Sequence, residues 1–159
     1  MSCTFPLPET SYELSITRLI DVRREKLFRC WTEPALIVQW FTPPPWKTIR
    51  AEVDVRAGGS CNIVMQGPDG TEMPNRGVYL EVIKNEKLVT TDAYTSAWVP
   101  SGKPFFTLVL TFEDEGGKTR YTARARHWTA EDCKSHEDMG FHEGWGICTD
   151  QLAALAATL

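Results

Sequence analysis

Residues 141–159 read FHEGWGICTDQLAALAATL and carry the clearest amphipathic helical pattern in the chain. Large apolar side chains recur at alternating steps of four and three residues, at Phe141, Trp145, Cys148, Leu152, Leu155 and Leu159. At about 100° per residue these positions share a stripe roughly 80° wide, which is narrow enough to be one buried face. The pattern predicts one long C-terminal helix, from about residue 131 to 157, which needs a broad apolar surface to lie on.

The middle of the chain, residues 49–128, shows the two-residue alternation of β-strands. Ile49, Ala51, Val53 and Val55 alternate with charged residues, and Pro68-Asp69-Gly70 is a strong hairpin turn. Further alternating runs and turns follow up to residue 128. The sequence therefore predicts six or seven antiparallel strands ahead of the long helix.

Two short helices are expected between the first strand, residues 12–20, and this run of strands. Asp21 is a suitable cap for the first helix, and Pro34 suits the first turn of the second. Three prolines at 43–45 end that second helix. The predicted fold is α+β: a helix-grip fold in which a curved antiparallel sheet wraps around a long C-terminal helix, with two short helices after the first strand.

Length and composition indicate one globular domain at residues 11–159, after an irregular lead-in at residues 1–10 that contains two prolines. The chain has 159 residues, of which 42% are hydrophobic and 24% charged. No apolar run approaches the ~18 residues that span a bilayer, and the N-terminus lacks the pattern of a signal peptide. We expect a cytoplasmic protein without a membrane span.

Charge and cysteine usage exclude several classes of partner. The net charge is −4 and no basic cluster stands out, so the sequence predicts no nucleic-acid binding. Five scattered cysteines without a C-x-x-C pair suit free thiols in a reducing compartment. Cys133 and His136 have a workable spacing for two metal ligands, but two ligands do not make a site. We therefore assign no metal and no cofactor.

The last strand, residues 119–128, has two distinct faces. Its even positions, Arg120 to Arg126, form a solvated face, whereas its odd positions are Tyr121, Ala123, Ala125 and His127. Two small inward residues either let a helix approach closely or leave room for a ligand. Glycines at 140 and 144 likewise favour a close approach of the sheet to the predicted helix.

Five short motifs resemble a known family over nearly the whole chain. They are QWF at 39–41, DVRAGG at 54–59, GPDGT at 67–71, NRGVYLEV at 75–82, and GFHEGW at 140–145 leading to DQL at 150–152. In this order they resemble the activator-of-heat-shock-protein-ATPase homologue family. This is the SRPBCC group of the helix-grip superfamily, which includes START-type and birch-pollen-allergen-like proteins.

The resemblance implies a helix-grip fold and either ligand binding or protein interaction. The sequence departs from the family after Phe41, where Thr42, three prolines and Trp46 replace the usual glycine and single proline. The family name comes from a eukaryotic co-chaperone in which this domain is only the C-terminal half. The activity in that name therefore does not transfer to this chain.

Our first interpretation is a protein that binds an apolar, aromatic or lipid-like small molecule between the sheet and the C-terminal helix, without catalysis. Parity and helical spacing place seven residues in the lining of that cavity: Trp40, Tyr121, Ala123, Ala125, His127, Phe141 and Trp145. A site of this kind is usually apolar and rich in aromatic side chains. No catalytic residue is assigned.

Two alternatives stay open. The first is a co-chaperone-like interaction module that uses the sheet, or a rim of Trp46 and Trp98, to bind a chaperone or a second copy of the chain. The second is an enzyme of hydrolase or cyclase type on a hydrophobic substrate. In it His127 would move a proton while Tyr121 polarises a carbonyl group. No second acid or nucleophile is identifiable beside these two residues, which favours binding over catalysis.

Overall fold

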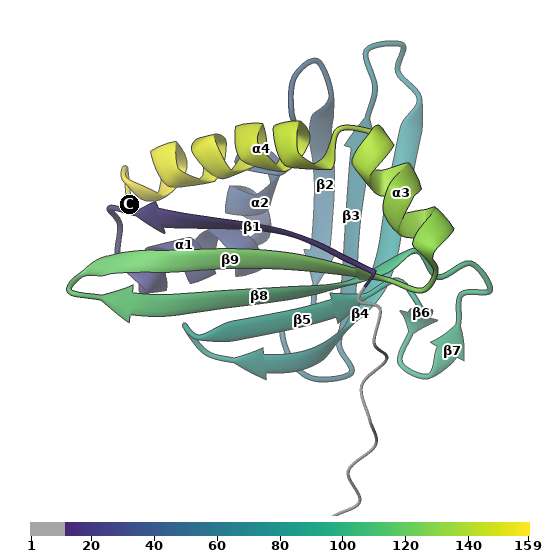
Figure 1. Cartoon of the computed structure of the whole chain (residues 1–159), viewed down its shortest axis with the longest axis horizontal. Helices are drawn as coiled ribbons and strands as arrows, with labels where there is room; N and C mark the ends of the chain where they lie inside the picture. Colours follow the sequence, from purple (N-terminus) through teal and green to yellow (C-terminus); the bar gives the residue numbers. More distant parts are fainter. Residues whose placement is uncertain (1–11) are drawn as a thin grey trace, which may run out of the picture.

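The computed structural model describes residues 12–159 (Figure 1), so the predicted lead-in at residues 1–10 lies outside the described part. Its elements are β1 (Glu13–Ile20), α1 (Arg24–Thr32), α2 (Pro34–Trp40), β2 (Lys47–Val53), β3 (Ser60–Gln66), β4 (Glu72–Ile83), β5 (Lys87–Thr91), β6 (Tyr94–Ser96), β7 (Val99–Pro100), β8 (Phe106–Glu115), β9 (Lys118–His127), α3 (Ala130–Asp138) and α4 (Phe141–Ala156). The two short helices after the first strand are confirmed.

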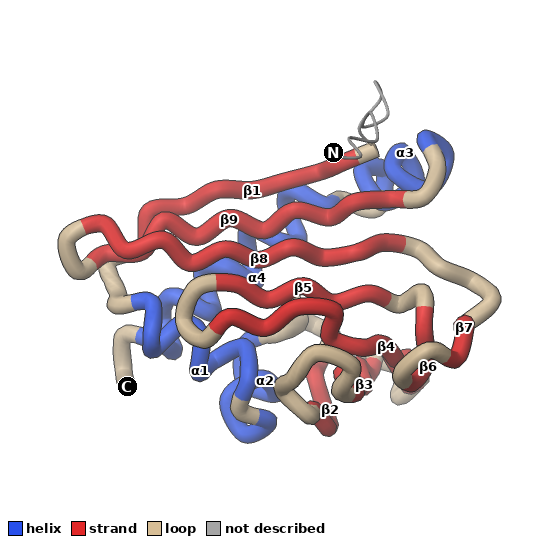
Figure 2. Tube along the Cα trace, turned by 90° about the horizontal axis from the view of Figure 1, so that it is seen from below, coloured by secondary structure: helices blue, strands red, loops and turns tan. Residues whose placement is uncertain are grey.

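Seven strands form one antiparallel sheet in the order β1-β9-β8-β5-β4-β3-β2, which confirms the predicted α+β helix-grip fold. The helices α1, α2 and α4 lie on one side of this sheet, and Figure 2 shows them behind the strands. The remaining strands, β6 and β7, form a separate small hairpin over residues 94–100. The sheet thus has an inner face toward the helices and an outer face.

The sheet bends where β4 changes its partners. Residues 72–78 of β4 pair with β3, and residues 78–83 pair with β5. Gly77 lies at this change, and a Cβ atom there would come within 2.5 Å of the Thr91 carbonyl oxygen. Only glycine allows this approach of two backbones without a shift. The bend turns β2 and β3 up beside the helices, as Figure 1 shows.

The C-terminal helical region is broken, so the prediction of one helix from 131 to 157 is wrong. The helix α3 ends at Asp138, and Gly140 adopts a left-handed conformation with φ of 88° before α4 begins at Phe141. Glycine pays no steric penalty in that conformation. Gly144 does not mark a close approach either, because nothing lies within 4 Å of the position a Cβ would take.

The apolar stripe predicted on the C-terminal helix does face the core. Leu152 is 0% exposed, Phe141 is buried, and Trp145 and Leu155 are partly buried against the same core. The buried face of α4 also includes Thr149 and Ala156, which lie beside the predicted apolar stripe. None of the helices over residues 12–159 is long and apolar enough to cross a bilayer.

Replacing Leu152 by alanine tests this burial. Because its side chain is 0% exposed in the main core, Leu152→Ala should lower the free energy of unfolding by about 2–5 kcal/mol. Leu19→Ala is the matched control, since Leu19 is 53% exposed on the outer face of β1 and should cost less than about 1 kcal/mol. Urea denaturation measures both. Equal losses would contradict the packing of α4.

Candidate functional site

The seven residues predicted to line a cavity fall into two adjoining clusters on the inner face. The main core contains Trp40, Tyr121 and Ala123, and the second cluster contains Ala125 and Phe141. Trp145 packs against both clusters, and His127 lies at the end of β9. The alternation on β9 therefore places its odd positions inward, as the sequence indicated.

The two alanines on β9 are covered by side chains of α4. Ala125 is 0% exposed and packs with Phe141, while the closest backbone neighbours of α4 are α1, β1 and α2. Ala123 is 0% and Tyr121 1% exposed, so no water-sized space adjoins them. The space that the small residues leave is thus filled by large side chains rather than by a close helix backbone.

Trp31 is the inner-face residue whose polar group is left unsatisfied. Its side chain is 7% exposed, and its indole Nε1–H is buried without a hydrogen-bond partner among the described residues. The ring packs edge-on against Trp40, with centroids 4.7 Å apart. A buried donor without an acceptor costs about 1–3 kcal/mol, so a native protein that keeps one calls for an explanation.

The Tyr121 phenol lies beside this indole. Burial raises the pKa of Tyr121, and a weaker hydrogen-bond interaction with the Trp31 side chain lowers it. The phenol is thus the polar group that the Trp31 N–H faces, but the contact falls outside good hydrogen-bond geometry. The phenol therefore stays protonated at neutral pH and can donate or accept a hydrogen bond. Trp31 is absent from the residues predicted to line a site, because nothing in the sequence shows that its N–H lacks a partner.

Two side-chain-to-backbone hydrogen bonds hold α4 against the end of α2. The side-chain amide nitrogen of Gln151 donates hydrogen bonds of 2.9 Å to the carbonyl oxygens of both Trp40 and Thr42. The Trp40 indole donates to the Cys30 carbonyl oxygen at 2.9 Å, which fixes α2 on α1. The QWF and DQL motifs of the sequence thus meet in space, and their contact holds the helices over the sheet.

Apolar side chains at one margin of the core are only partly covered. Val53, Val55 and Cys61, in β2, β3 and the turn between them, are partly exposed and pack against the main core. Phe41 and Cys148, from the end of α2 and from α4, are also partly exposed at this core. We call these five partly exposed residues the β2–α4 margin.

His127 has a partner that sequence reasoning missed. Its Nδ1 lies 2.9 Å from the Tyr12 carbonyl oxygen, and its Nε2 lies 2.7 Å from Nδ1 of His136 on α3. A carbonyl can only accept, so Nδ1 of His127 carries a hydrogen. In the neutral ring Nε2 then accepts, and His136 donates from its own Nδ1. The short connection through Trp128 and Thr129 places α3 beside the end of β9.

The pair needed for catalysis is not brought together. Tyr121 and His127 are six residues apart on one extended strand, which separates their positions by roughly 20 Å. His127 contacts His136 and the rings of Phe105 and Phe106 instead. The enzyme alternative requires His127 to move a proton while Tyr121 polarises a carbonyl group of the same substrate. The distance between the two residues rules this out, so that prediction is wrong.

The loop tryptophans also differ from the rim that was hypothesised. Trp46 is partly buried, and its ring lies so close to Gly67 that a Cβ there would be 3.3 Å away. Trp98 is 77% exposed in the turn between β6 and β7, where its φ of 64° is unusual for a bulky residue. Of the two, only Trp98 is exposed enough to contact a partner.

A curved seven-stranded antiparallel sheet with α1, α2 and α4 on its inner face defines a helix-grip protein, a class that often binds hydrophobic ligands. The chain belongs to the family described as Activator of Hsp90 ATPase homolog 1-like protein, which it matches over residues 21–157. This confirms the family that the motifs indicated. No curated protein matches the chain.

Solved structures agree with this assignment. A crystal structure of a Nitrosomonas europaea protein is 40% identical, with a TM-score of 0.88, and the match covers 92% of this chain and 94% of that one. A Mycobacterium smegmatis protein is 25% identical, with a TM-score of 0.77 and coverages of 91% and 90%. A Rhodobacter sphaeroides protein shares the fold at 19% identity, with a TM-score of 0.82 and coverages of 96% and 97%.

The histidine pair predicts an acid-dependent loss of stability. Burial, and secondly His127, lower the pKa of His136 to about 4 from its usual 6.5. Between these pH values the unfolded chain binds the proton more readily than the folded one, so stability falls as the pH drops from 6.5 toward 4. His136→Gln should remove roughly 1–2 kcal/mol of the loss between pH 6.5 and 4.5, allowing for partial exposure.

Urea denaturation at pH 6.5 and pH 4.5 measures this difference. The quantity compared is the change in the free energy of unfolding between the two pH values, not its value at pH 6.5. His142→Gln is the control, because His142 is exposed on α4 and makes no hydrogen bond through its ring within residues 12–159. The free energy of unfolding of His142→Gln should fall between pH 6.5 and 4.5 by as much as that of the unmodified protein. An equal acid loss in both variants would contradict the assigned role of His136.

Proposed function

We propose that the protein binds an apolar or aromatic small molecule, carrying at least one hydrogen-bond acceptor, between the sheet and α4. The observation that carries this proposal is the buried Nε1–H of Trp31, which makes no well-formed hydrogen bond within residues 12–159 although the Tyr121 phenol lies beside it. A ligand oxygen there would satisfy the indole and could also bond with the Tyr121 phenol. The proposed function is binding without catalysis.

The β2–α4 margin is the proposed entrance. Val53, Val55 and Cys61 on one side, with Phe41 and Cys148 on the other, offer apolar side chains that are not fully covered. Burying their remaining exposed area would contribute roughly 25 cal/mol per Å². The margin adjoins the main core, which contains both Trp31 and Tyr121.

Entry of a ligand requires side chains to move. Because the interior is filled around Tyr121 and Ala123, a bound molecule would displace partly buried groups, of which Trp145 and Phe41 belong to the same core. We propose that the ligand site is lined by all the residues predicted from the sequence: Trp40, Tyr121, Ala123, Ala125, His127, Phe141 and Trp145. Of these, Trp40, Tyr121 and Ala123 share the main core with Trp31.

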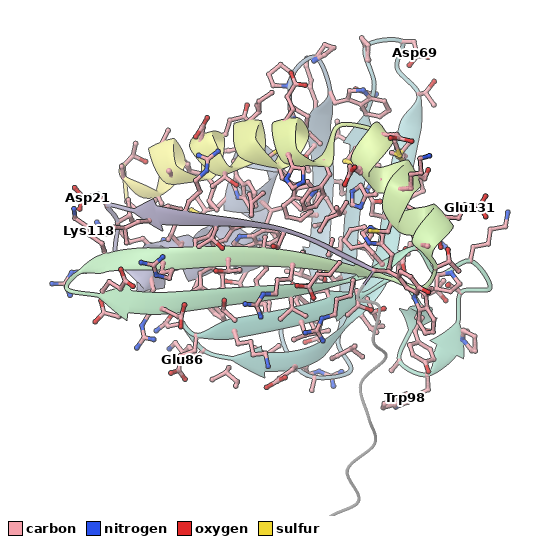
Figure 3. All side chains as sticks on the ribbon, viewed as in Figure 1. Asp21, Asp69, Glu86, Trp98, Lys118 and Glu131 are labelled. Atoms are coloured by element: carbon pink, nitrogen blue, oxygen red, sulfur yellow. The ribbon has the colours of Figure 1, made fainter. Side chains whose placement is uncertain are left out.

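A second candidate function is an interaction module for a chaperone or another protein. Its support is the family description and the exposed Trp98, which projects from the β6–β7 hairpin (Figure 3). Tyr94 packs edge-on against its ring with centroids 5.9 Å apart. This hairpin lies beside the β2–β3 turn, where Tyr94 and Trp98 line a pocket with Arg56 and Gly58, so the test below varies Val53 and Trp98 separately. For either function we propose a reducing cytoplasm, which suits the free thiols of Cys30, Cys61, Cys133 and Cys148.

Titration with the apolar fluorophore N-phenyl-1-naphthylamine tests the binding proposal. The dye should show saturable fluorescence enhancement, and Val53→Trp should weaken its binding at least tenfold by filling the entrance. Leu19→Trp places the same ring on the outer face and should bind the dye as the unmodified protein does. Circular dichroism confirms that both variants fold.

Three outcomes separate the candidate functions. Loss of dye binding in Val53→Trp alone supports the internal site. Equal binding in both variants, or no saturable binding to the unmodified protein, contradicts it. Weakening by Trp98→Ala instead would place the apolar contact on the hairpin and favour the interaction module.

A further inference from the structure

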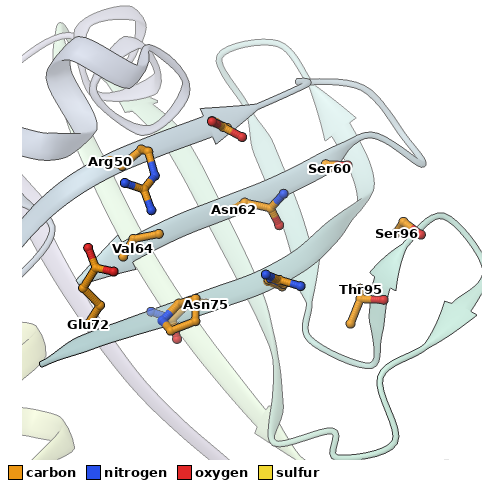
Figure 4. Close-up of a pocket in the computed structure, with 11 residues that line it drawn as sticks. Arg50, Ser60, Asn62, Val64, Glu72, Asn75, Thr95 and Ser96 are labelled. Atoms are coloured by element: carbon orange, nitrogen blue, oxygen red, sulfur yellow. The ribbon is translucent and has the colours of Figure 1, made fainter. Parts of the chain in front are cut away.

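A polar recess lies on the outer face of the sheet, away from the helices. Its volume is about 560 Å³, which falls within the range typical of small-molecule sites. The floor is made by β2, β3 and β4, and the β6 strand of the small hairpin adds Thr95 and Ser96 as one wall (Figure 4). Asn75 and Arg76 of this recess belong to the NRGVYLEV motif, but none of its residues was predicted to bind a ligand.

Strand register arranges the charges of the recess in rows. In one row Glu52 of β2 pairs with Asn62 of β3, which in turn pairs with Arg76 of β4. Directly paired residues on one face of a sheet have Cβ atoms about 4.5–5.5 Å apart. The central amide is thus flanked by a carboxylate on one side and a guanidinium on the other. In the next row Arg50 of β2 pairs with Val64 of β3, and Figure 4 shows both side chains at the recess.

The polar groups of this row do not satisfy one another. The side-chain oxygen of Asn62 is buried and has no hydrogen-bond partner within the described residues. Arg76 and Glu52 form no ion pair within residues 12–159, and the same holds for Arg50. On the outer face of β9, by contrast, the three arginines are paired, as in Arg126 with Glu13 at 3.0 Å. The charged side chains of the recess are therefore unpaired, whereas the arginines on the outer face of β9 form ion pairs.

We propose that this recess binds a small zwitterion of the amino-acid or dipeptide class. The Arg76 guanidinium and the Thr95 hydroxyl supply donors for a carboxylate at one end. The Glu52 carboxylate supplies an acceptor for an ammonium group at the other end, and the Asn62 oxygen supplies a second one once its side chain turns toward the ligand. A ligand that carries only a carboxylate leaves Glu52 without a partner, and a ligand that carries only an ammonium group leaves Arg76 without one.

The size of the row fits such a ligand. Two strand spacings separate β2 from β4, which is roughly 9.6 Å between backbones, and the side chains reach inward from both. An extended dipeptide spans roughly 7 Å. The site lies on the opposite face of the sheet from Trp31, so it is independent of the internal site proposed above.

Nuclear magnetic resonance titration of the ¹⁵N-labelled full chain with glycylglycine tests this site. The side-chain amide signals of Asn62 and the backbone signals of residues 60–64 should shift and saturate at millimolar concentration. N-acetylglycylglycine lacks the ammonium group and glycylglycinamide lacks the carboxylate. Each should bind at least fivefold more weakly.

Variants complete the test. Arg76→Gln should weaken glycylglycine binding at least tenfold, and Asn62→Leu should do the same with an unchanged pattern of other signals. Arg120→Gln is the matched control, because Arg120 pairs with Glu115 outside the recess and should leave binding unchanged. Equal shifts for the three compounds, unsaturated shifts up to 50 mM glycylglycine, or equal binding by the Arg76 and Arg120 variants would overturn the proposal.

Discussion

The apolar stripe of α4 must be covered, and this constraint organises the rest of the structure. Leu152 is fully buried, and the two hydrogen bonds from Gln151 to the backbone at the end of α2 hold the helix in place. With α4 fixed, α1 and α2 are held beside it, and Trp31 is enclosed with Trp40 and Phe41. Burial of a helix face thus creates an interior in which one donor has no acceptor.

The sheet contributes through its curvature. Gly77 lets β4 pass from β3 to β5 at a distance that a Cβ would forbid. The bend brings β2 and β3 alongside the helices on the inner face, which leaves Val53 and Cys61 partly covered. It also brings the rows of polar side chains on the outer face close to the β6–β7 hairpin. One bend therefore shapes both faces on which binding is proposed.

Regular periodicity made much of the fold predictable from the sequence. The inward position of Tyr121 and Ala123 followed from alternation on β9, and the burial of Leu152 followed from helical spacing. The break at Gly140 did not follow, because a glycine is tolerated inside a helix as well as at its end. The pairing of His127 with His136 depends on how the turn at residues 128–129 sets α3 against β9, and the residue pattern does not indicate that angle.

The candidate sites were harder to predict than the fold because they depend on missing contacts. Whether the Trp31 N–H or the Asn62 oxygen finds a partner is decided by several elements at once. No local pattern of residues reports it. Motifs located the family correctly, yet they include neither Trp31 nor Asn62.

Native mass spectrometry of the full chain, purified from its own host under mild conditions, tests the proposed internal site most directly. Because a molecule that satisfies Trp31 and fills the core is enclosed, it should stay bound after purification. The account predicts a folded species heavier than the chain by a small organic molecule, which is released when the protein is denatured. A folded species with the mass of the chain alone, under conditions that retain other noncovalent complexes, would contradict it.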